Sequence, residues 1–318
     1  MKFIFFGTPE FAAIILEKLI SADYVPVAVV CNPNESVGRK QILTSPPVKR
    51  LIEKHLPAGR QEWPIEIFQP VTKSELSAIS YKLKAIKPDL IIVAAYGKIL
   101  SKEILDIPVY GFINVHGSLL PYYRGASPIQ TAILNGEKET GVTIMKVDEE
   151  MDHGPIISNI KIQISNIDTY ESLSQRMAKL GAELLIKTIP NYISGKIKLI
   201  EQEHSKATYT KIIKKEDGKI DWSKSAQDIE RMTRAYYPWP SAYANIKNKI
   251  LKIIEADVSE IDNNYEIGEV FLTINNELAI KCGKDTLIVK KLQLEGGKVL
   301  MAKEFINGHK SFIGSVLE

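Results

Sequence analysis

Short, continuous apolar runs that alternate with helical segments constrain the first half of this chain more than any other feature. Residues 2–6 and 25–31 are expected to be strands flanking a helix that ends near residue 20, and residues 89–97 form a third apolar run. Strands buried on both faces lack polar alternation, and a helix between two such strands is the usual parallel crossover. The pattern predicts an α/β fold with a doubly wound, mostly parallel sheet.

The turn after the first strand argues against a dinucleotide site in this sheet. In Gly7-Thr8-Pro9-Glu10, Thr8 can cap the helix, Pro9 suits its first position and Glu10 suits its N-terminus. The turn has one glycine rather than G-x-G-x-x-G, and the second strand ends in Cys31-Asn32 where a ribose-binding acid is expected. A nicotinamide enzyme is therefore an alternative that these details oppose.

Polar side chains follow two later strands, at the point where each strand ends. Side chains alternate faces along a strand, so Asn114 and His116 share one face near the end of the strand that starts at residue 112. Asp152 follows the strand at 141–147, in the loop DEEMDHG. Ligands of open α/β sheets bind outside the carboxyl ends of the strands, so Asn114, His116 and Asp152 are expected to converge there. The plain alternative is that these polar residues only meet water.

The sequence pattern changes after residue 194, where a polar, lysine-rich stretch replaces the alternation of apolar strands and helices. We assign residues 1–194 to a catalytic domain, 195–208 to a polar linker and 209–318 to a smaller domain. Ser225, with Asp228 three residues on, caps a helix whose buried stripe is Ile229, Met232 and Tyr236. Short strands divided by turns follow, which predicts a small β-barrel of the oligonucleotide-binding kind. Its lysines form either a solvated surface or a polyanion site: Lys247, Lys249, Lys252, Lys281, Lys284, Lys290 and Lys291.

Composition limits the partners and the compartment. A formal charge of +3 over 318 residues excludes a strongly basic module, so any polyanion site is a local patch. The two cysteines, Cys31 and Cys282, form no disulfide framework or zinc spacing, which fits a reducing cytoplasm. The apolar start of the chain is too short for a signal sequence or a membrane span.

Two further segments matter for the later argument. Residues 32–47 form a polar loop around Gly38-Arg39-Lys40, longer than most connections of this kind, and such loops are often functional. The plain alternative is a solvated loop with two ordinary charges. Residues 74–86 carry apolar side chains on one face, which predicts a single amphipathic helix.

Six motifs together resemble the methionyl-tRNA formyltransferases, in the right order and over nearly the whole chain. They are FGTPEFA at 6–12, NVHGSLLPYYRGASPIQTAI at 114–133, TGVTIMKVDEEMDHGPII at 140–157, ATYTKI at 207–212, IDW at 220–222 and PWP at 238–240. The N-x-H-x-SLLP core with its later Asp is shared by formyl transferases that use 10-formyltetrahydrofolate. The acceptor is indicated by the loop at 32–47 and by the C-terminal motifs.

The resemblance implies direct formyl transfer, without a metal, from 10-formyltetrahydrofolate to the methionine amine of charged initiator tRNA. Asn114 would donate to the developing oxyanion, His116 would add a donor or move a proton, and Asp152 would orient the imidazole. The family holds the pterin at the apolar run and at the turn Ser118, Leu119, Leu120 and Pro121. Arg39 and Lys40 match the basic tip of the loop that reaches tRNA. We expect a monomer.

Three rival functions stay open on the sequence alone. The same chemistry could act on an aminosugar nucleotide or on glycinamide ribonucleotide, although the latter needs no second domain. A tRNA-binding protein with a degraded folate site would not keep Asn114, His116 and Asp152 together. A metal site made of His116, Asp152 and His153 lacks a ligand-spacing signature.

Overall fold

The computed structural model describes residues 1–38, 41–55, 65–247, 249–260 and 264–318, and the chain divides into two compact units. Unit 1 comprises residues 1–128, 139–163 and 174–211, and unit 2 comprises 129–138, 164–173 and 212–318. None of the described helices is long and apolar enough to cross a membrane. Every residue of the candidate site belongs to unit 1.

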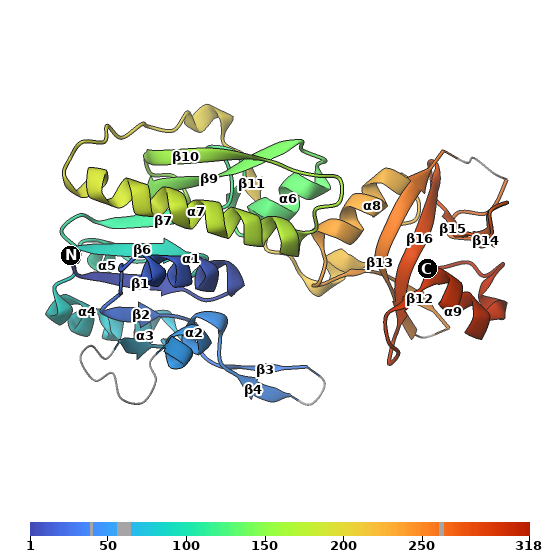
Figure 1. Ribbon diagram of the computed structural model, residues 1–318, viewed down its shortest axis with the longest axis horizontal. Coiled ribbons are helices and arrows are strands. Elements are labelled where there is room, and N and C mark those ends of the chain that lie inside the picture. Colours follow the sequence, from blue (N-terminus) through green and yellow to red (C-terminus); the bar gives the residue numbers. More distant parts are fainter. Residues whose placement is uncertain (39–40, 56–64, 248, 261–263) are drawn as a thin grey trace. The chain divides into compact units, whose positions relative to one another are not determined.

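Unit 1 is built on a seven-stranded sheet with the order β10-β9-β7-β6-β1-β2-β5 (Figure 1). The five strands from β7 to β5 run parallel, and β9 and β10 are antiparallel additions at one edge. The strand bounds are β1 Phe3–Gly7, β2 Ala28–Val30, β5 Glu66–Phe68, β6 Leu90–Ala94, β7 Phe112–His116, β9 Glu139–Lys146 and β10 Ile156–Gln163. The predicted mostly parallel α/β sheet is confirmed.

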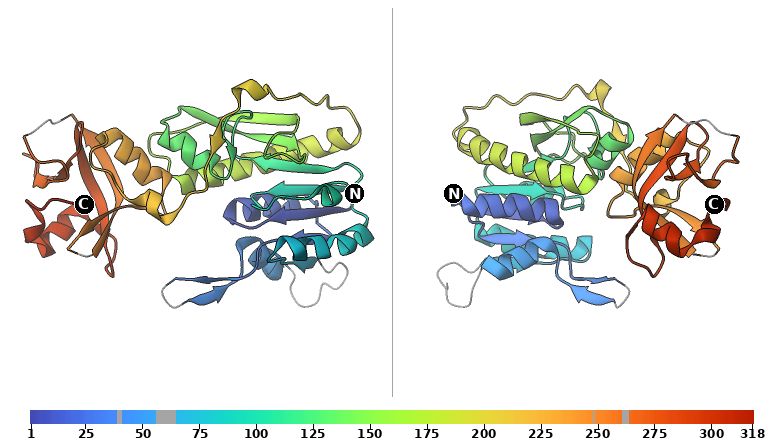
Figure 2. Two further views of the ribbon diagram at one scale, coloured as in Figure 1. Left: turned by 180° about the vertical axis from the view of Figure 1, so that it is seen from behind. Right: turned by 45° about the vertical axis from the view of Figure 1, so that its right-hand side comes forward.

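Helices cover both faces of this sheet (Figure 2). Their bounds are α1 Glu10–Ser21, α2 Pro47–His55, α3 Lys73–Ala78, α4 Ser80–Ile86, α5 Lys102–Leu105 and α7 Tyr170–Ile193. Helix α6, Pro128–Leu134, falls almost wholly within unit 2. On one face, Leu76, Leu83 and Ile104 of α3, α4 and α5 share a buried core with Phe112 of β7. On the other face α7 lies close to the sheet, since a Cβ at Gly181 would be 3.0 Å from Val115.

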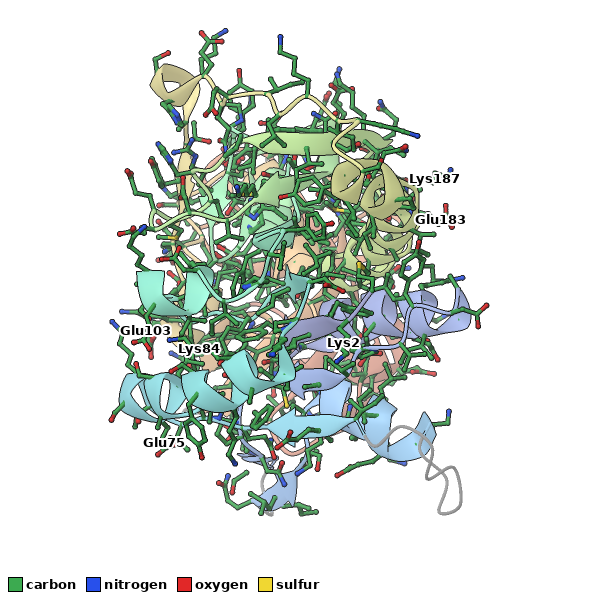
Figure 3. All side chains as sticks on the ribbon, turned by 90° about the vertical axis from the view of Figure 1, so that its left-hand side faces the viewer. Lys2, Glu75, Lys84, Glu103, Glu183 and Lys187 are labelled. Carbon is green, nitrogen blue, oxygen red and sulfur yellow. The ribbon has the colours of Figure 1, made fainter. Side chains whose placement is uncertain are left out.

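The outer surfaces of these helices carry charged residues, as amphipathic packing requires. Lys84 Nζ lies 3.1 Å from the Glu103 carboxylate, which joins α4 to α5 (Figure 3). Glu183 and Lys187 extend from the exposed side of α7 in the same view. Burial raises the pKa of the Cys31 thiol beside this sheet to about 11, so Cys31 has little thiolate character at neutral pH.

Three local predictions were wrong. Thr8 does not cap α1, whose N-cap is Pro9; the Thr8 hydroxyl instead accepts a hydrogen bond from the Asn32 amide at 3.1 Å. The single helix predicted for residues 74–86 is two helices, because Ile79 ends α3 and precedes α4. The loop at 32–47 contains a hairpin, β3 Glu35–Val37 and β4 Ile42–Thr44, that extends from the sheet (Figure 1).

Unit 2 is an antiparallel sheet, β12-β13-β16-β15-β14, which curls into a half-barrel. Strand β17 also pairs with β16, and α8 packs against β13 and β16. The bounds are β12 Ala242–Ile246, β13 Lys249–Ser259, β14 Val270–Leu272, β15 Leu278–Lys281, β16 Thr286–Leu294, β17 Leu300–Met301, α8 Ala226–Ala235 and α9 Ala302–Gly308. Ser225 caps α8 as predicted, by accepting from the Asp228 amide.

The remaining short elements are two strands and three turns of 3₁₀ helix. The bounds are β8 Arg124–Gly125, β11 Tyr209–Thr210, η1 His204–Lys206, η2 Lys215–Gly218 and η3 Lys310–Phe312. Strands β8 and β11 pair in parallel, although about 85 positions separate them in the chain. Residues 200–211, most of which fall in the predicted linker, are thus part of unit 1 and lie next to the candidate site.

Candidate active site

Strand β7 presents the first two residues of the site. Phe112, Asn114 and His116 alternate with Ile113 and Val115, so the two polar side chains share the face that carries α3, α4 and α5. Val115 points to the opposite face, toward α7. Because β7 pairs with β6 on one side and β9 on the other, its polar end lies inside the sheet rather than at an edge.

Asp152 meets both of these side chains. Asn114 Nδ2 donates to Asp152 Oδ1 at 3.3 Å, and His116 Nδ1 lies 3.5 Å from Asp152 Oδ2. The Gly125 amide donates to the same Oδ2 at 2.7 Å. Asp152 adopts a left-handed backbone conformation, φ +50°, which side chains rarely take without support. Asn114, His116 and Asp152 therefore converge as predicted, but not at a shared carboxyl edge, because Asp152 follows β9, which runs antiparallel to β7.

The imidazole of His116 is held from two sides and is 95% buried. Its Nε2 lies 2.9 Å from the Tyr123 carbonyl oxygen, so this nitrogen carries a proton and donates it. Its Nδ1 faces the Asp152 carboxylate. With Nε2 committed to a carbonyl, any proton that His116 gains or loses must move at Nδ1.

Hydrogen bonds from side-chain hydroxyls to backbone carbonyl oxygens hold the turn after β7. The Ser118 hydroxyl donates to the Tyr122 carbonyl oxygen at 2.6 Å, and the Thr143 hydroxyl donates to the Ser118 carbonyl oxygen at 2.7 Å. The Leu120 side chain is buried against Met145 and Ile156. Only Leu119 and Pro121, of the four residues predicted to bind folate, keep partly exposed side chains.

Gly125 supplies the amide that holds Asp152, and its own conformation requires glycine. Its φ is +107°, and a Cβ there would lie 2.8 Å from the Thr210 carbonyl oxygen. This close approach arises because β8 and β11 pair at this point. Sequence reasoning noted this glycine but assigned it no role.

Two buried side chains that sequence reasoning missed lie behind the site. Arg124 is 2% exposed and Gln202 is 4% exposed. The Arg124 guanidinium donates to Gln202 Oε1, and Gln202 Nε2 donates to backbone carbonyls of the Asp152 loop. Gln202 stands in the polar run EQEHSK, where no periodicity marks a buried residue, so no sequence signal pointed to it.

Tyr96 follows β6, the strand beside β7, and belongs to the core on the same face of the sheet as Asn114. Its ring packs edge-on against Phe6 at 5.1 Å between centroids. Its buried hydroxyl has no hydrogen-bond partner within the described ranges, and burial raises its pKa. A buried polar atom of this kind is costly unless it is satisfied by something else.

Other predicted site residues are not brought together. Arg39 and Lys40 lie outside the described residues. His153 turns away from His116: its Nδ1 contacts Asp148 at 2.7 Å and its ring stacks on His204 at 4.0 Å. Across the part of the chain that the structure describes, no group of three or more His, Cys, Asp or Glu residues is arranged to hold a metal ion.

Comparison with known proteins places this site in a family. The formyl transferase family model matches residues 1–189, and the model of the formyl transferase C-terminal domain matches residues 212–310. A methionyl-tRNA formyltransferase of Caldicellulosiruptor saccharolyticus is 42% identical over 320 aligned residues, covering 100% of each chain. The chain is therefore a formyl transferase by family.

Solved structures agree at the level of the fold. The methionyl-tRNA formyltransferase from Clostridium thermocellum aligns with a TM-score of 0.57 and 18% identity, over 95% of this chain and 99% of that one. The sugar 3N-formyl transferase WlaRD aligns with a TM-score of 0.62 and 23% identity, over 94% and 99%. Because the chain is 42% identical to the Caldicellulosiruptor saccharolyticus methionyl-tRNA formyltransferase over the full length of both, it belongs to the methionyl-tRNA formyltransferase family.

Proposed function

We propose that this chain transfers the formyl group of 10-formyltetrahydrofolate to the methionine amine of methionyl initiator tRNA, and that Asn114, His116 and Asp152 carry the reaction. The observation that supports these roles is the convergence of Asn114 Nδ2 and His116 Nδ1 on the two carboxylate oxygens of Asp152. In the reaction the amine nitrogen bonds to the formyl carbon, and the bond from that carbon to N10 of the folate then breaks.

Asn114 stabilises the oxyanion that develops on the formyl oxygen. Its amide group has two N–H donors, and only one of them is occupied by Asp152. The second has no acceptor among the residues that the structure describes, and in this proposal it faces the substrate at the end of β7. A preorganised donor of this kind lowers the barrier by about 3 kcal/mol.

Asp152 and His116 move the proton. The attacking amine must lose a proton as the new C–N bond forms, and the leaving N10 must gain one. Asp152 is the acceptor because its carboxylate faces the substrate side and His116 Nδ1 adjoins it. His116 shares that proton through Nδ1, while Nε2 stays on the Tyr123 carbonyl. The second-donor role expected for His116 would require Nδ1 to be protonated and to turn its N–H from Asp152 to the substrate.

A folate-derived formyl donor fits the same face of the sheet. Leu119 and Pro121 offer partly exposed apolar surface, whereas the Ser118 hydroxyl and the Leu120 side chain serve the interior. The turn would therefore contact the pterin through Leu119, Pro121 and backbone atoms. The unpartnered hydroxyl of Tyr96 is a polar group that a bound ligand or water could satisfy. WlaRD was crystallised with 5-N-formyl-THF.

The acceptor tRNA would contact the hairpin β3–β4 and unit 2. Ile42 and Leu43 of the hairpin are more than 60% exposed, next to Arg39 and Lys40 in the chain. In unit 2 the structure disfavours Lys290 as a phosphate contact, because its ammonium pairs with Glu277 at 2.8 Å and Asp257 at 3.3 Å. Lys247 and Lys249 are exposed and form the better candidates.

We further propose that the protein acts as a cytoplasmic monomer. The two cysteines are buried and free, which fits a reducing compartment. Light scattering of the purified protein should give a mass near 35.6 kDa. A mass twice as large would overturn the monomer.

The test of the proposed function is an acceptor competition with the purified protein. 10-Formyltetrahydrofolate is supplied with methionyl initiator tRNA in one reaction and with a dTDP-linked aminosugar in a parallel one. Formylation of the tRNA alone supports the proposal. Formylation of the sugar alone would keep the chemistry of Asn114, His116 and Asp152 and overturn the acceptor.

A further inference from the structure

Gln202 holds the backbone of the loop that carries Asp152. Its Nε2 donates to the Asp152 carbonyl oxygen at 2.9 Å and to the Gly154 carbonyl oxygen at 2.7 Å. Both N–H groups of the amide are therefore used on two carbonyls that flank His153. These bonds act where Asp152 is in the left-handed region, a conformation that persists only when the surroundings enforce it.

Arg124 fixes which way the Gln202 amide points. Its Nη2 and Nε donate to Gln202 Oε1 at 2.8 and 3.2 Å, and Nη2 also donates to His204 Nδ1 at 2.8 Å. A guanidinium has donors only. A flipped amide would place its NH₂ group against Arg124 and its oxygen against the two loop carbonyls, so only the observed orientation is stable.

This arrangement is unusual for a buried charge. Within the described residues Arg124 forms no ion pair with a carboxylate, and it is nearly fully buried. A buried cation is costly to desolvate, and here its hydrogen bonds go to neutral partners. The structural effect of the buried guanidinium is to fix the orientation of Gln202 Oε1.

Residues 200–211, which contain Gln202, also hold the backbone groups that contact the side chains of Asp152 and His116. Thr208 accepts from the Tyr123 amide through its hydroxyl at 2.8 Å, and β11 pairs with β8, which contains Gly125. Tyr123 holds His116 and Gly125 holds Asp152 Oδ2. Residues 200–211 thus contact the backbone on both sides of the Asp152–His116 pair.

We propose that Gln202, oriented by Arg124, is a positioning residue for formyl transfer: it sets the conformation in which the Asp152 carboxylate reaches Asn114 and His116. This inference rests on the role proposed for Asp152. Gln202 does not contact the reacting atoms itself. It acts by keeping the Asp152 carbonyl in place, which leaves the carboxylate little freedom to turn away.

The test is Gln202→Glu, which has the same shape and keeps an acceptor for Arg124 but replaces the two donors by an oxygen that repels both loop carbonyls. We expect kcat for methionyl-tRNA to fall at least tenfold, with KM for tRNA within twofold and an unchanged circular dichroism spectrum. Gln293→Glu is the matched control, because Gln293 also donates to a backbone carbonyl, that of Gly297, but in unit 2. It should change kcat by less than twofold.

A double-mutant cycle separates positioning from a general structural role. If Gln202 acts through Asp152, Gln202→Glu should lower single-turnover rates far less in an Asp152→Asn background than in the wild type. Equal losses in both backgrounds would overturn the proposal, as would a wild-type kcat in the single variant. Should Gln202→Glu not fold, Arg124→Lys replaces it in the cycle, because a lysine cannot contact both Gln202 and His204. Arg124→Lys must then lower kcat in the wild-type background and far less in the Asp152→Asn background. A wild-type protein that fails to formylate the tRNA would instead overturn the proposed function.

Discussion

At the scale of single residues, the role of each polar side chain in the site depends on which of its N–H groups are not already hydrogen-bonded within the protein. Asn114 uses one N–H on Asp152 and keeps another, whereas both nitrogens of His116 already face partners. This difference assigns oxyanion stabilisation to the amide and proton transfer to the imidazole with Asp152. The two roles can be tested separately, because removing the amide leaves the carboxylate and the imidazole in contact.

Asn114→Ala should lower kcat by a factor of about 100 or more, since a single preorganised oxyanion donor contributes about 3 kcal/mol. Steady-state formylation of methionyl-tRNA measures the loss, and KM for the tRNA should stay within a few-fold. Asn159→Ala is the matched control, because Asn159 is exposed on the antiparallel edge strand β10. A kcat above one tenth of the wild-type value for Asn114→Ala would remove the amide from the mechanism.

The sequence placed Asn114 and His116 through the end of β7, whose neighbour β6 runs parallel to it. Asp152 was named with them, but the reason given for it does not hold, because it follows β9, which runs antiparallel to β7, and the loop after β9 brings it to the site. Gln202 and Arg124 could not be found in this way. Their burial depends on residues 200–211 folding back along β8, and this pairing of two-residue strands leaves no periodic pattern in the sequence.

At the scale of elements, predictions succeeded where hydrophobic periodicity was long and failed where a local contact decided the outcome. The buried strands β1, β2 and β6 and the helix α8 after Ser225 are examples of success. The break between α3 and α4 was missed because the apolar stripe continues through Ile79, which is both the C-cap of α3 and the N-cap of α4. The hairpin β3–β4 was missed because its strands have three residues each and carry mostly polar or exposed side chains.

The cap of α8 is an element whose energetic contribution can be measured. The Ser225 hydroxyl accepts from the Asp228 amide at 3.1 Å and donates to the Asp228 carboxylate at 2.7 Å. Ser225→Ala should reduce the free energy of unfolding of unit 2 by about 1 kcal/mol, the usual cost of losing such a cap. Urea denaturation followed by tryptophan fluorescence reports it, since Trp222 lies in the same core as α8.

Ser225→Thr serves as the control for this cap, because threonine keeps the hydroxyl and is also a good N-cap residue. We expect it to retain most of the wild-type stability. Equal unfolding midpoints for Ser225→Ala and the wild type would show that the helix is held by its packing on β13 and β16 alone. Formylation kinetics should not change in either variant at temperatures where unit 2 stays folded.

At the scale of the whole molecule, a net charge of +3 leaves tRNA affinity to local groups of lysines. Lys247 and Lys249 are exposed near the start of β13, whereas Lys290 and Lys291 already pair with carboxylates of their own sheet. Paired ammonium groups release fewer counterions on binding a phosphate, so the unpaired ones should dominate the salt dependence. We therefore predict that tRNA contacts of unit 2 lie at the end of the β12–β13 pair that carries Lys247 and Lys249.

The double variant Lys247→Glu/Lys249→Glu should therefore weaken tRNA binding at low salt and reduce the slope of log Kd against log salt concentration by about 1.5, since each lost phosphate contact removes about 0.7–0.9 from it. At saturating tRNA its kcat should match the wild type, because Asn114, His116 and Asp152 are untouched. Lys179→Glu/Lys187→Glu makes the same change of charge on exposed residues of α7, which covers the face of the sheet opposite Asn114. If both double variants lower the slope equally, tRNA responds to overall charge and the β12–β13 end of unit 2 is not its contact; if only the first does, the lysines at that end bind the phosphates.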